Sequence, residues 1–238
     1  MLWPRRFCVR ITSFPVEGTA LKYLAAFTYF LAATVVAPAL AQTAPATAGG
    51  PAWTAFSKFT DATPRYVETI VANELKGGAT SLESYRFTWM EPSNAKIEVL
   101  DGEQKGSVVA WTGGSQVHAH DGQHPGIVLP FDRTDKSVID LRGNVVGAAA
   151  FSALRTAWAA GGPLTETPGP VINGGPTTIV TMNPDPAKTN GVTRGDLYIA
   201  ANGAPQRILL YQGTTIVERD DFKDQNLTAD VSSRDFSI

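Results

Sequence analysis

The segment of residues 84–124 constrains the fold of this chain most, because apolar and polar side chains alternate along it. Aromatic residues occupy every second position at Tyr85, Phe87 and Trp89. Since successive side chains of a β-strand point to opposite faces, this alternation predicts a strand with one apolar face. Further alternating segments, and the turn signals between them, lie at 96–100, Asp101-Gly102, 107–112, Gly113-Gly114 and 116–120. The stretch therefore predicts an antiparallel meander whose aromatic-rich face needs an apolar cover.

Residues 1–41 are expected to be a signal peptide rather than part of the fold. Residues 24–37 form an uncharged apolar run that is preceded by Lys22 and followed by Ala39-Leu40-Ala41, a small-x-small cleavage site. A run of this length is too short to span a bilayer comfortably, since a spanning helix needs about 20 residues. We therefore expect cleavage after this site and export of the mature chain to the periplasm.

The segment before the apolar run also bears on the start and chemistry of the chain. It is long for a signal peptide and carries Glu17, which favours a translation start nearer Leu21. Cys8, the single cysteine, lies in this segment as well. A mature chain that begins at Gln42 would therefore have no disulfide and no lipid attached through an N-terminal cysteine, and its stability would depend on a hydrophobic core.

The charge of the predicted mature chain argues against polyanionic partners. The whole chain has a formal net charge of −2, and removal of residues 1–41 takes away four cationic side chains and one anionic one, which leaves about −5. The mature part has no block of basic residues. Because nucleic acids and anionic membrane surfaces are bound mainly through clustered Lys and Arg, we expect neither as a main partner.

Residues 42–52 and 53–238 differ in composition and are expected to differ in order. The first segment is rich in Ala, Pro, Gly and Thr and predicts a disordered leader. The second is long enough for one sizeable domain. Trp53, Phe56 and Phe59 are three residues apart, which predicts a short helix over 53–63 on which they share one side.

A second and longer helix is predicted over residues 143–160. Asn144 is a favourable N-cap, and Gly161-Gly162-Pro163 ends the pattern. The segment 164–176 is expected to be a loop rich in Pro and Gly. Strands outside the meander are predicted at 66–75, 127–129, 137–141, 177–182, 196–200, 206–211 and 215–222, with a final edge strand within 226–238. The fold class is therefore α+β, with an antiparallel sheet of about ten strands wrapped by two helices.

Motifs typical of enzymes are weak in this chain. Gly113-Gly114-Ser115 is followed by a strand, whereas a serine nucleophile elbow joins a strand to a helix. The glycines near Asn173 precede a strand as well, so they offer no helix N-terminus to a phosphate. By alternation, the following carboxylates are expected to lie mostly on a solvated sheet face: Glu68, Glu74, Glu83, Glu91, Glu98 and Glu103. The sequence therefore predicts no catalytic residue, no cofactor and no enzymatic activity.

The histidines allow one alternative, because all three lie in a single short segment at His118, His120 and His124. On a strand, His118 and His120 share a face and could chelate zinc or copper, with His124 or Asp121 completing the set. The other interpretation is a polar strand end beside the Asp121-Gly122 turn, without a metal. No second ligand cluster stands out elsewhere in the sequence, which favours the polar strand end.

The tryptophans Trp53, Trp89, Trp111 and Trp158 also have two interpretations. Each could simply belong to the core. Together, aromatics on a sheet and a helix could line a cavity between them, and a concave sheet capped by a helix can hold an acyl chain with little need for polar groups. Glycines that flank or enter the longer predicted helix, at 143, 147, 161 and 162, favour a helix that can move as a cover.

Two groups of spaced positions resemble a known family, and together they extend over most of residues 66–238. The first is Tyr85-x-Phe87-x-Trp89-x-x-Pro92-x-x-x-Lys96-Ile97-x-Val99-x-x-Gly102. The second comprises Gly203-x-Pro205-x-Arg207-Ile208, Asp220-Asp221-Phe222 and Phe236-x-Ile238. This pattern resembles the LolA-like periplasmic lipoprotein carriers and outer-membrane lipoprotein-sorting proteins. The resemblance implies an unclosed antiparallel half-barrel covered by helices, with an apolar cavity for acyl chains. Lys96 departs from the arginine that such carriers commonly have after the proline, and the family pattern does not require the histidine cluster.

The sequence thus favours an exported, non-enzymatic, monomeric protein that binds lipid or the acyl chains of a lipoprotein, with a possible envelope protein as partner. The expected cavity residues are Tyr85, Phe87, Trp89, Val109, Trp111, Phe151, Leu154 and Trp158. One alternative is an interaction or structural module of the cell envelope, whose sheet would be fully packed and whose partners would dock at exposed edges. The other is a metal-binding protein that uses His118, His120 and His124.

Overall fold

The computed structural model describes residues 49–238, which form a single antiparallel sheet with two α-helices and a short 3₁₀ helix. The predicted signal peptide and most of the predicted leader lie outside the described residues. The elements in chain order are α1 Pro51–Ala62, β1 Arg65–Lys76, β2 Ala79–Met90, β3 Asn94–Asp101, β4 Val108–Thr112, β5 Gln116–His120, β6 Leu129–Asp132, α2 Phe151–Ala160, β7 Thr165–Pro168, β8 Thr177–Met182, β9 Arg194–Ala200, β10 Pro205–Gln212, β11 Thr215–Asn226 and η1 Ser233–Phe236.

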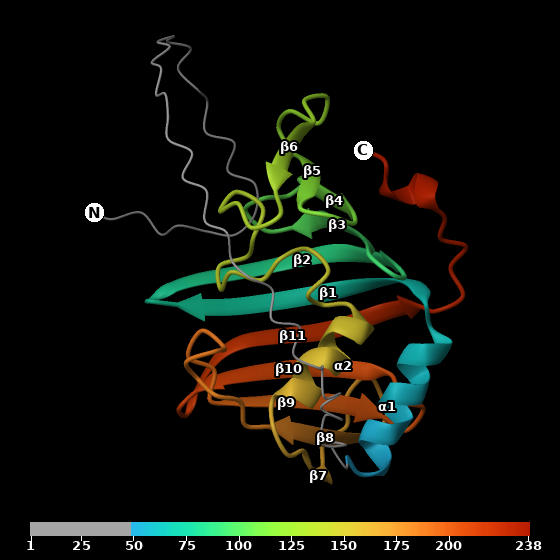
Figure 1. The fold of residues 1–238 in the computed structure, drawn as a ribbon, viewed down its shortest axis with the longest axis vertical. Coiled ribbons are helices and arrows are strands. Elements are labelled where there is room, and N and C mark those ends of the chain that lie inside the picture. Colours follow the sequence, from blue (N-terminus) through green and yellow to red (C-terminus); the bar gives the residue numbers. More distant parts are fainter. Residues whose placement is uncertain (1–48) are drawn as a thin grey trace, which may run out of the picture. The chain divides into compact units, whose positions relative to one another are not determined.

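The eleven strands are ordered β6-β5-β4-β3-β2-β1-β11-β10-β9-β8-β7, and every neighbouring pair is antiparallel. The two outer strands, β6 and β7, are not paired with each other, so the sheet does not close into a barrel. Figure 1 shows α2 lying over β9, β10 and β11, with α1 beside it. The predicted α+β fold, an unclosed antiparallel half-barrel covered by helices, is confirmed.

The long hairpin of β1 and β2 carries the aromatic alternation that the sequence predicts. In its register Tyr66 lies opposite Trp89, and Ile70 lies opposite Tyr85. These side chains, together with Phe87, are buried on one face of the sheet. Because residues two apart on a strand share a face, the alternation in β2 places its three aromatic residues on this inner face.

Strand β11 pairs with β1 and thereby joins the two ends of the domain in the middle of the sheet. Ile70 pairs with Phe222, and Glu74 lies directly opposite Glu218. This pairing brings together residues about 150 positions apart in the chain, and it decides which face of β1 is buried. The inner face of β1 consists of Tyr66, Glu68, Ile70, Ala72 and Glu74.

Helix α1 begins two residues earlier than predicted, inside the segment assigned to the leader. Pro51 stands in its first turn, where a missing N–H costs nothing. No side chain at its own N-cap satisfies the free N–H groups. Instead the Glu166 carboxylate of β7 accepts hydrogen bonds from the N–H groups of Ala52 at 3.2 Å and Trp53 at 2.8 Å. A segment predicted to be a loop therefore contains a short edge strand that caps α1.

The long predicted helix is wrong in its first half, since α2 begins only at Phe151. Gly143 and Gly147 have φ angles of +95° and +91°, which are incompatible with a right-handed helix. Asn144 does not cap a helix; its side-chain amide donates to the Glu218 carboxylate at 3.4 Å. Residues 143–145 therefore have no regular structure, residues 146–149 form turns, and this segment reaches across the inner face of the sheet.

Two predicted strands are also absent from the described part of the chain. Residues 137–141 form turns, because the Asp140 carboxylate accepts hydrogen bonds from the N–H groups of Arg142 at 2.9 Å and Asn144 at 2.6 Å. The C-terminal residues after Asn226 run without a ladder partner and end in the 3₁₀ helix η1. Side-chain hydrogen bonds to the local backbone have replaced strand pairing at both places.

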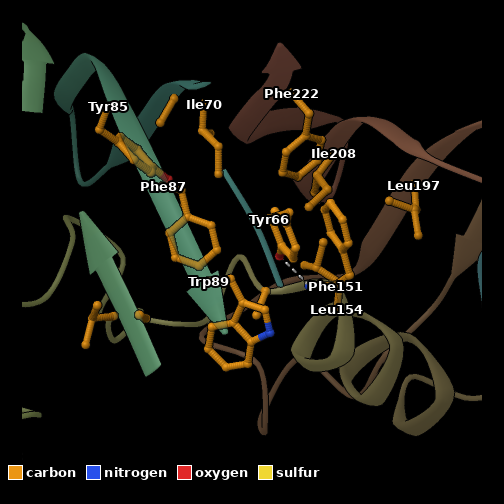
Figure 2. Packing of buried hydrophobic residues seen from close by; sticks show 14 of the residues in the cluster. Tyr66, Ile70, Tyr85, Phe87, Trp89, Phe151, Leu154, Leu197, Ile208 and Phe222 are labelled. Carbon is orange, nitrogen blue, oxygen red and sulfur yellow. Dashed lines mark hydrogen bonds between the residues drawn. The ribbon is translucent and has the colours of Figure 1, made fainter. Parts of the chain in front are cut away.

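The core lies between the inner face of the sheet and the two helices. Tyr66 and Phe151 stack with ring centroids 3.9 Å apart, and the Phe151 N–H donates to the Tyr66 hydroxyl at 3.0 Å (Figure 2). The indole N–H of Trp158 donates to the carbonyl of Val180 at 3.0 Å and ties α2 to β8. No helix within residues 49–238 is long and apolar enough to cross a membrane.

Candidate functional site

A cavity of about 330 Å³ lies between the inner face of the sheet and the segment that leads into α2. Its walls come from the central strands, from residues 144–149, from α2 and from the turn around Asn190. The apolar part of the lining consists mainly of Tyr85, Phe87, Ile97, Val146, Leu154, Trp158, Met182, Ile208 and Leu210. The interior is therefore hollow, whereas a pure interaction module was expected to have a fully packed sheet.

The predicted cavity residues divide into two groups in the structure. Four of them line the cavity: Tyr85, Phe87, Leu154 and Trp158. The other four, Trp89, Val109, Trp111 and Phe151, lie outside its lining. Trp89, Val109 and Phe151 are buried core residues, whereas Trp111 is only half-buried at the core margin, and its indole N–H donates to the carbonyl of Gly114 at 3.0 Å.

Sequence reasoning missed the polar end of the cavity. Four carboxyl groups line it: Glu74 on β1, Glu218 and Asp220 on β11, and Asp140 in the turn before α2. The expectation that the glutamates face solvent is wrong for Glu68, Glu74 and Glu83, which are all buried. The reason is the phase of β1 and β2, in which these glutamates share a face with Tyr66, Ile70 and Tyr85.

A hydrogen-bonded turn holds these carboxyl groups in place. One Glu74 oxygen accepts from the N–H of Leu141 at 3.0 Å, and the Glu74 and Asp140 carboxyls are hydrogen-bonded to each other. Arg142 forms an ion pair with Glu218 at 3.3 Å and also donates to the carbonyl of Leu75 at 3.2 Å. The polar end is thus prearranged by backbone and side-chain contacts from β1, β11 and the turn.

Burial and mutual repulsion raise the pKa of these groups. For Glu74 burial is the main cause and the neighbouring carboxylates add to it, which raises the pKa from 4.5 to about 10. For Glu218 burial and Asp140 raise the pKa to about 7, although Arg142 opposes this. Burial, followed by the charge of Glu218, also raises the pKa of Asp220 well above its usual value. Burial therefore favours the neutral form of these carboxyls over the ionised form.

The three histidines do not converge on one point. His118 is exposed, while His120 is nearly buried and its Nδ1 lies 3.0 Å from the carbonyl oxygen of Asp121. His124 lies against the Asp121 carboxylate, with Nδ1 at 3.1 Å from an oxygen. Among residues 49–238, no group of three or more His, Cys, Asp or Glu side chains is arranged to hold a metal ion. The segment is a polar strand end followed by a turn.

The fold and the cavity together define an unclosed antiparallel half-barrel with a hollow inner face. No protein-family model matches the sequence, and no curated protein matches it. Among solved structures it is similar to a DUF1329 family protein from Desulfovibrio piger, with a TM-score of 0.43 and 9% identity over 78% of this chain and 95% of that one. It is also similar to a LolA superfamily protein from Nitrosomonas europaea, with a TM-score of 0.39 and 12% identity over 80% and 99% of the two chains.

A third similar structure is the lipoprotein LppX of Mycobacterium tuberculosis, with a TM-score of 0.43 and 14% identity over 77% of this chain and 100% of that one. A member of the LolA superfamily, which the sequence pattern resembles, is thus among the solved structures to which this chain has a distant similarity.

Proposed function

We propose that this chain is an exported, non-enzymatic carrier that binds an acyl chain in the cavity between its sheet and α2. The observation that carries the proposal is the hollow, largely apolar inner face of an open sheet. Its volume of about 330 Å³ falls in the range of roughly 300–1,000 Å³ that is usual for small-molecule sites. Burial of each methylene group there would contribute roughly 0.8 kcal/mol to binding.

The walls of the cavity suit a ligand that enters and leaves. Residues 144–149 cover it without regular secondary structure. Gly147 allows the chain to turn there, with a φ angle of +91°, and a Cβ at this position would lie 3.3 Å from the Trp111 ring. Because this cover depends on turns rather than on a helix ladder, it is the part of the wall that can open at least cost.

The location and organisation of the protein belong to the same proposal. Residues 1–41 act as a cleaved signal peptide, the residues between it and α1 as a leader, and the chain from Pro51 onwards as the binding domain in the periplasm. The protein acts as a monomer on lipid or lipoprotein acyl chains, and an envelope protein serves as donor or acceptor of the cargo.

A pair of variants on one helix tests where the chain binds. Ala157 and Ala159 are both exposed residues of α2, but Ala157 belongs to the cavity lining and Ala159 does not. Ala157→Phe places a bulky ring at the edge of the cavity, and we expect it to weaken binding of a fluorescent fatty-acid probe at least about tenfold, the equivalent of roughly 1.4 kcal/mol. Ala159→Phe should leave the affinity unchanged.

Native mass spectrometry of the chain from Gln42 onwards, followed by organic extraction, tests the same proposal without a probe. A bound mass that extracts as lipid is the expected result. A clean protein mass together with no affinity of the unmodified protein for acyl probes would overturn the carrier function.

A further inference from the structure

Carboxyl groups outnumber the cationic side chains that pair with them at one end of the cavity. Glu74 and Glu218 face each other across the β1–β11 pairing, and Asp220 follows two residues further along the same face. Among the described residues, Arg142 is the cation paired with this group, through Glu218. Lys188 also lines the cavity, but it is exposed and pairs with Asp185 at 3.7 Å.

Asp220 provides an independent sign that this end of the cavity can accept a hydrogen-bond donor from a ligand. Its side chain is only 7% exposed, and its Oδ1 atom has no hydrogen-bond partner within the described part of the chain. Asp220 also belongs to the cavity lining. A buried acceptor without a partner costs about 1–3 kcal/mol, and such atoms in proteins mark sites of strain, ions or ligands. The carboxyl group is therefore available to a donor that arrives from the cavity.

The neighbouring carboxyls are satisfied by the protein, in contrast to Asp220. Asp140 accepts the N–H groups of Arg142 and Asn144, and Glu74 accepts the N–H of Leu141. Glu218 receives the guanidinium of Arg142 and the amide of Asn144. These contacts keep the group rigid and leave one open acceptor, which is the arrangement of a prepared binding site.

The open acceptor lies next to the apolar part of the cavity. Asp220 pairs with Ile208 of β10 and Ala72 of β1, and Phe222 follows two residues along the strand. Tyr85 lies beside Ile70 on the neighbouring strand. Since a step of two residues along a strand covers roughly 7 Å, a head group at Asp220 would place its attached chain against Tyr85 and Phe87.

We propose that the acidic end of the cavity binds the protonated amine of an amphiphile whose apolar chain lies along Tyr85, Phe87 and Leu154. An ammonium group brings three donors for the unpaired Asp220 oxygen and a positive charge that favours ionisation of the nearby carboxyls. A carboxylate or phosphate head group brings no positive charge and makes ionisation of these carboxyls more costly. A hydroxyl head group donates to Asp220 but supplies no charge to stabilise the ionised form.

This inference rests on the proposed acyl-chain binding, and a matched ligand series separates the two. Dodecylamine, 1-dodecanol and dodecanoate carry the same chain and differ in the head group. Their dissociation constants for the mature protein can be measured by displacement of a neutral fluorescent probe at pH 7.5, below the concentrations at which they form micelles. We expect dodecylamine to bind at least about tenfold more tightly than dodecanoate, as a charge-assisted hydrogen bond implies.

Two variants assign the preference to Asp220. Asp220→Asn should remove most of the advantage of the amine, while the affinity for 1-dodecanol changes less than about twofold. Glu68→Gln is the matched control, because Glu68 is another buried carboxyl with an unpartnered oxygen on the same sheet face, but it lies outside the cavity lining. This control should keep the preference for the amine.

The outcomes distinguish the two levels of the proposal. Equal affinities for all three ligands, or an equal effect of Asp220→Asn and Glu68→Gln, would overturn the amine site and leave acyl-chain binding intact. Tighter binding of dodecanoate would overturn it as well. If none of the three ligands binds, the acyl-carrier function fails and the amine site fails with it.

Discussion

At the scale of single residues, the side chain of Tyr66 on β1 caps the N-terminus of α2. The N-cap residue of α2 is Ala150, which has no side chain that can accept a hydrogen bond. The Tyr66 hydroxyl caps the helix instead, since it accepts a hydrogen bond from the N–H of Phe151 at 3.0 Å, and the two rings stack. The start of α2 is thereby fixed to β1, and the wall of the cavity is fixed to the middle of the sheet.

We expect Tyr66→Phe to lower the free energy of unfolding by about 1–3 kcal/mol, because it leaves the buried N–H of Phe151 without a partner. Urea denaturation followed by circular dichroism measures this change. Tyr198→Phe is a suitable control, since the Tyr198 hydroxyl makes no hydrogen bond to another described residue. A loss for Tyr66→Phe no larger than for this control would show that the hydroxyl does not cap α2.

At the scale of elements, the segment before α2 does not form the helix that its sequence predicts. Residues 143–150 are predicted to begin a helix, yet residues 146–149 form turns, and residues 144–149 line the cavity. Two glycines at positive φ and the hydrogen bonds to Asp140 favour the turned form. The carboxyl cluster and the cavity depend on this form, because a helix in this segment would remove both the Asp140 turn and the cover.

The effect of Gly147→Ala on the free energy of unfolding has opposite signs for a helix and for a turn at this position. In an exposed helix, alanine would stabilise the chain by about 1 kcal/mol relative to glycine. Here Gly147 has a φ angle of +91°, and an added Cβ would lie 3.3 Å from the Trp111 ring. We therefore expect a loss of about 1–2 kcal/mol in the free energy of unfolding. Gly126→Ala, where an added Cβ meets no atom within 4 Å, should be nearly neutral in the same assay.

At the scale of the whole molecule, the inner face of the sheet contains many more carboxyl groups than a core usually tolerates. Burial raises the pKa of Glu68 to about 8 and that of Glu83 to about 8, in addition to the groups that line the cavity. Buried carboxyls are costly when ionised, so the fold is adapted to hold several of them in the neutral form.

This arrangement predicts how stability depends on pH. Between the unfolded value of 4.5 and about 8, the folded chain binds more protons at Glu68 than the unfolded chain does. The contribution of such a group is fully present below pH 4.5 and is lost as the pH rises through 8. We therefore expect the free energy of unfolding to be higher at pH 5 than at pH 9, by more than about 1 kcal/mol.

The control for the pH profile is Glu68→Gln, which removes one titrating group and should flatten the profile between pH 5 and 9. Its effect should be stabilising at the alkaline end. Asp121 and Asp235, whose pKa values are lowered by hydrogen bonds, act in the opposite direction, but only near and below their usual range around pH 4. A profile that rises from pH 5 to pH 9 would contradict the neutral, buried state of the carboxyls.

The sequence by itself determined the class of the fold and four residues of the apolar cavity lining. Alternation in 85–90 and the turn signals at Gly102 and Gly113 are local properties, because strand period and turn geometry are set by neighbouring residues. They predicted the central meander, the C-terminal strands, and Tyr85 and Phe87 as cavity residues. Leu154 and Trp158 followed from the second half of the predicted helix, which does form.

Only the tertiary structure decided which face of β1 is inside and where α2 begins. Both faces of β1 offer apolar residues, Tyr66 and Ile70 on one and Val67 and Val71 on the other, so its local pattern has no preferred phase. Pairing with β11, about 150 residues away, selected the face that carries the glutamates. The acidic end of the cavity is a product of such long-range pairings, and for that reason no local pattern could reveal it.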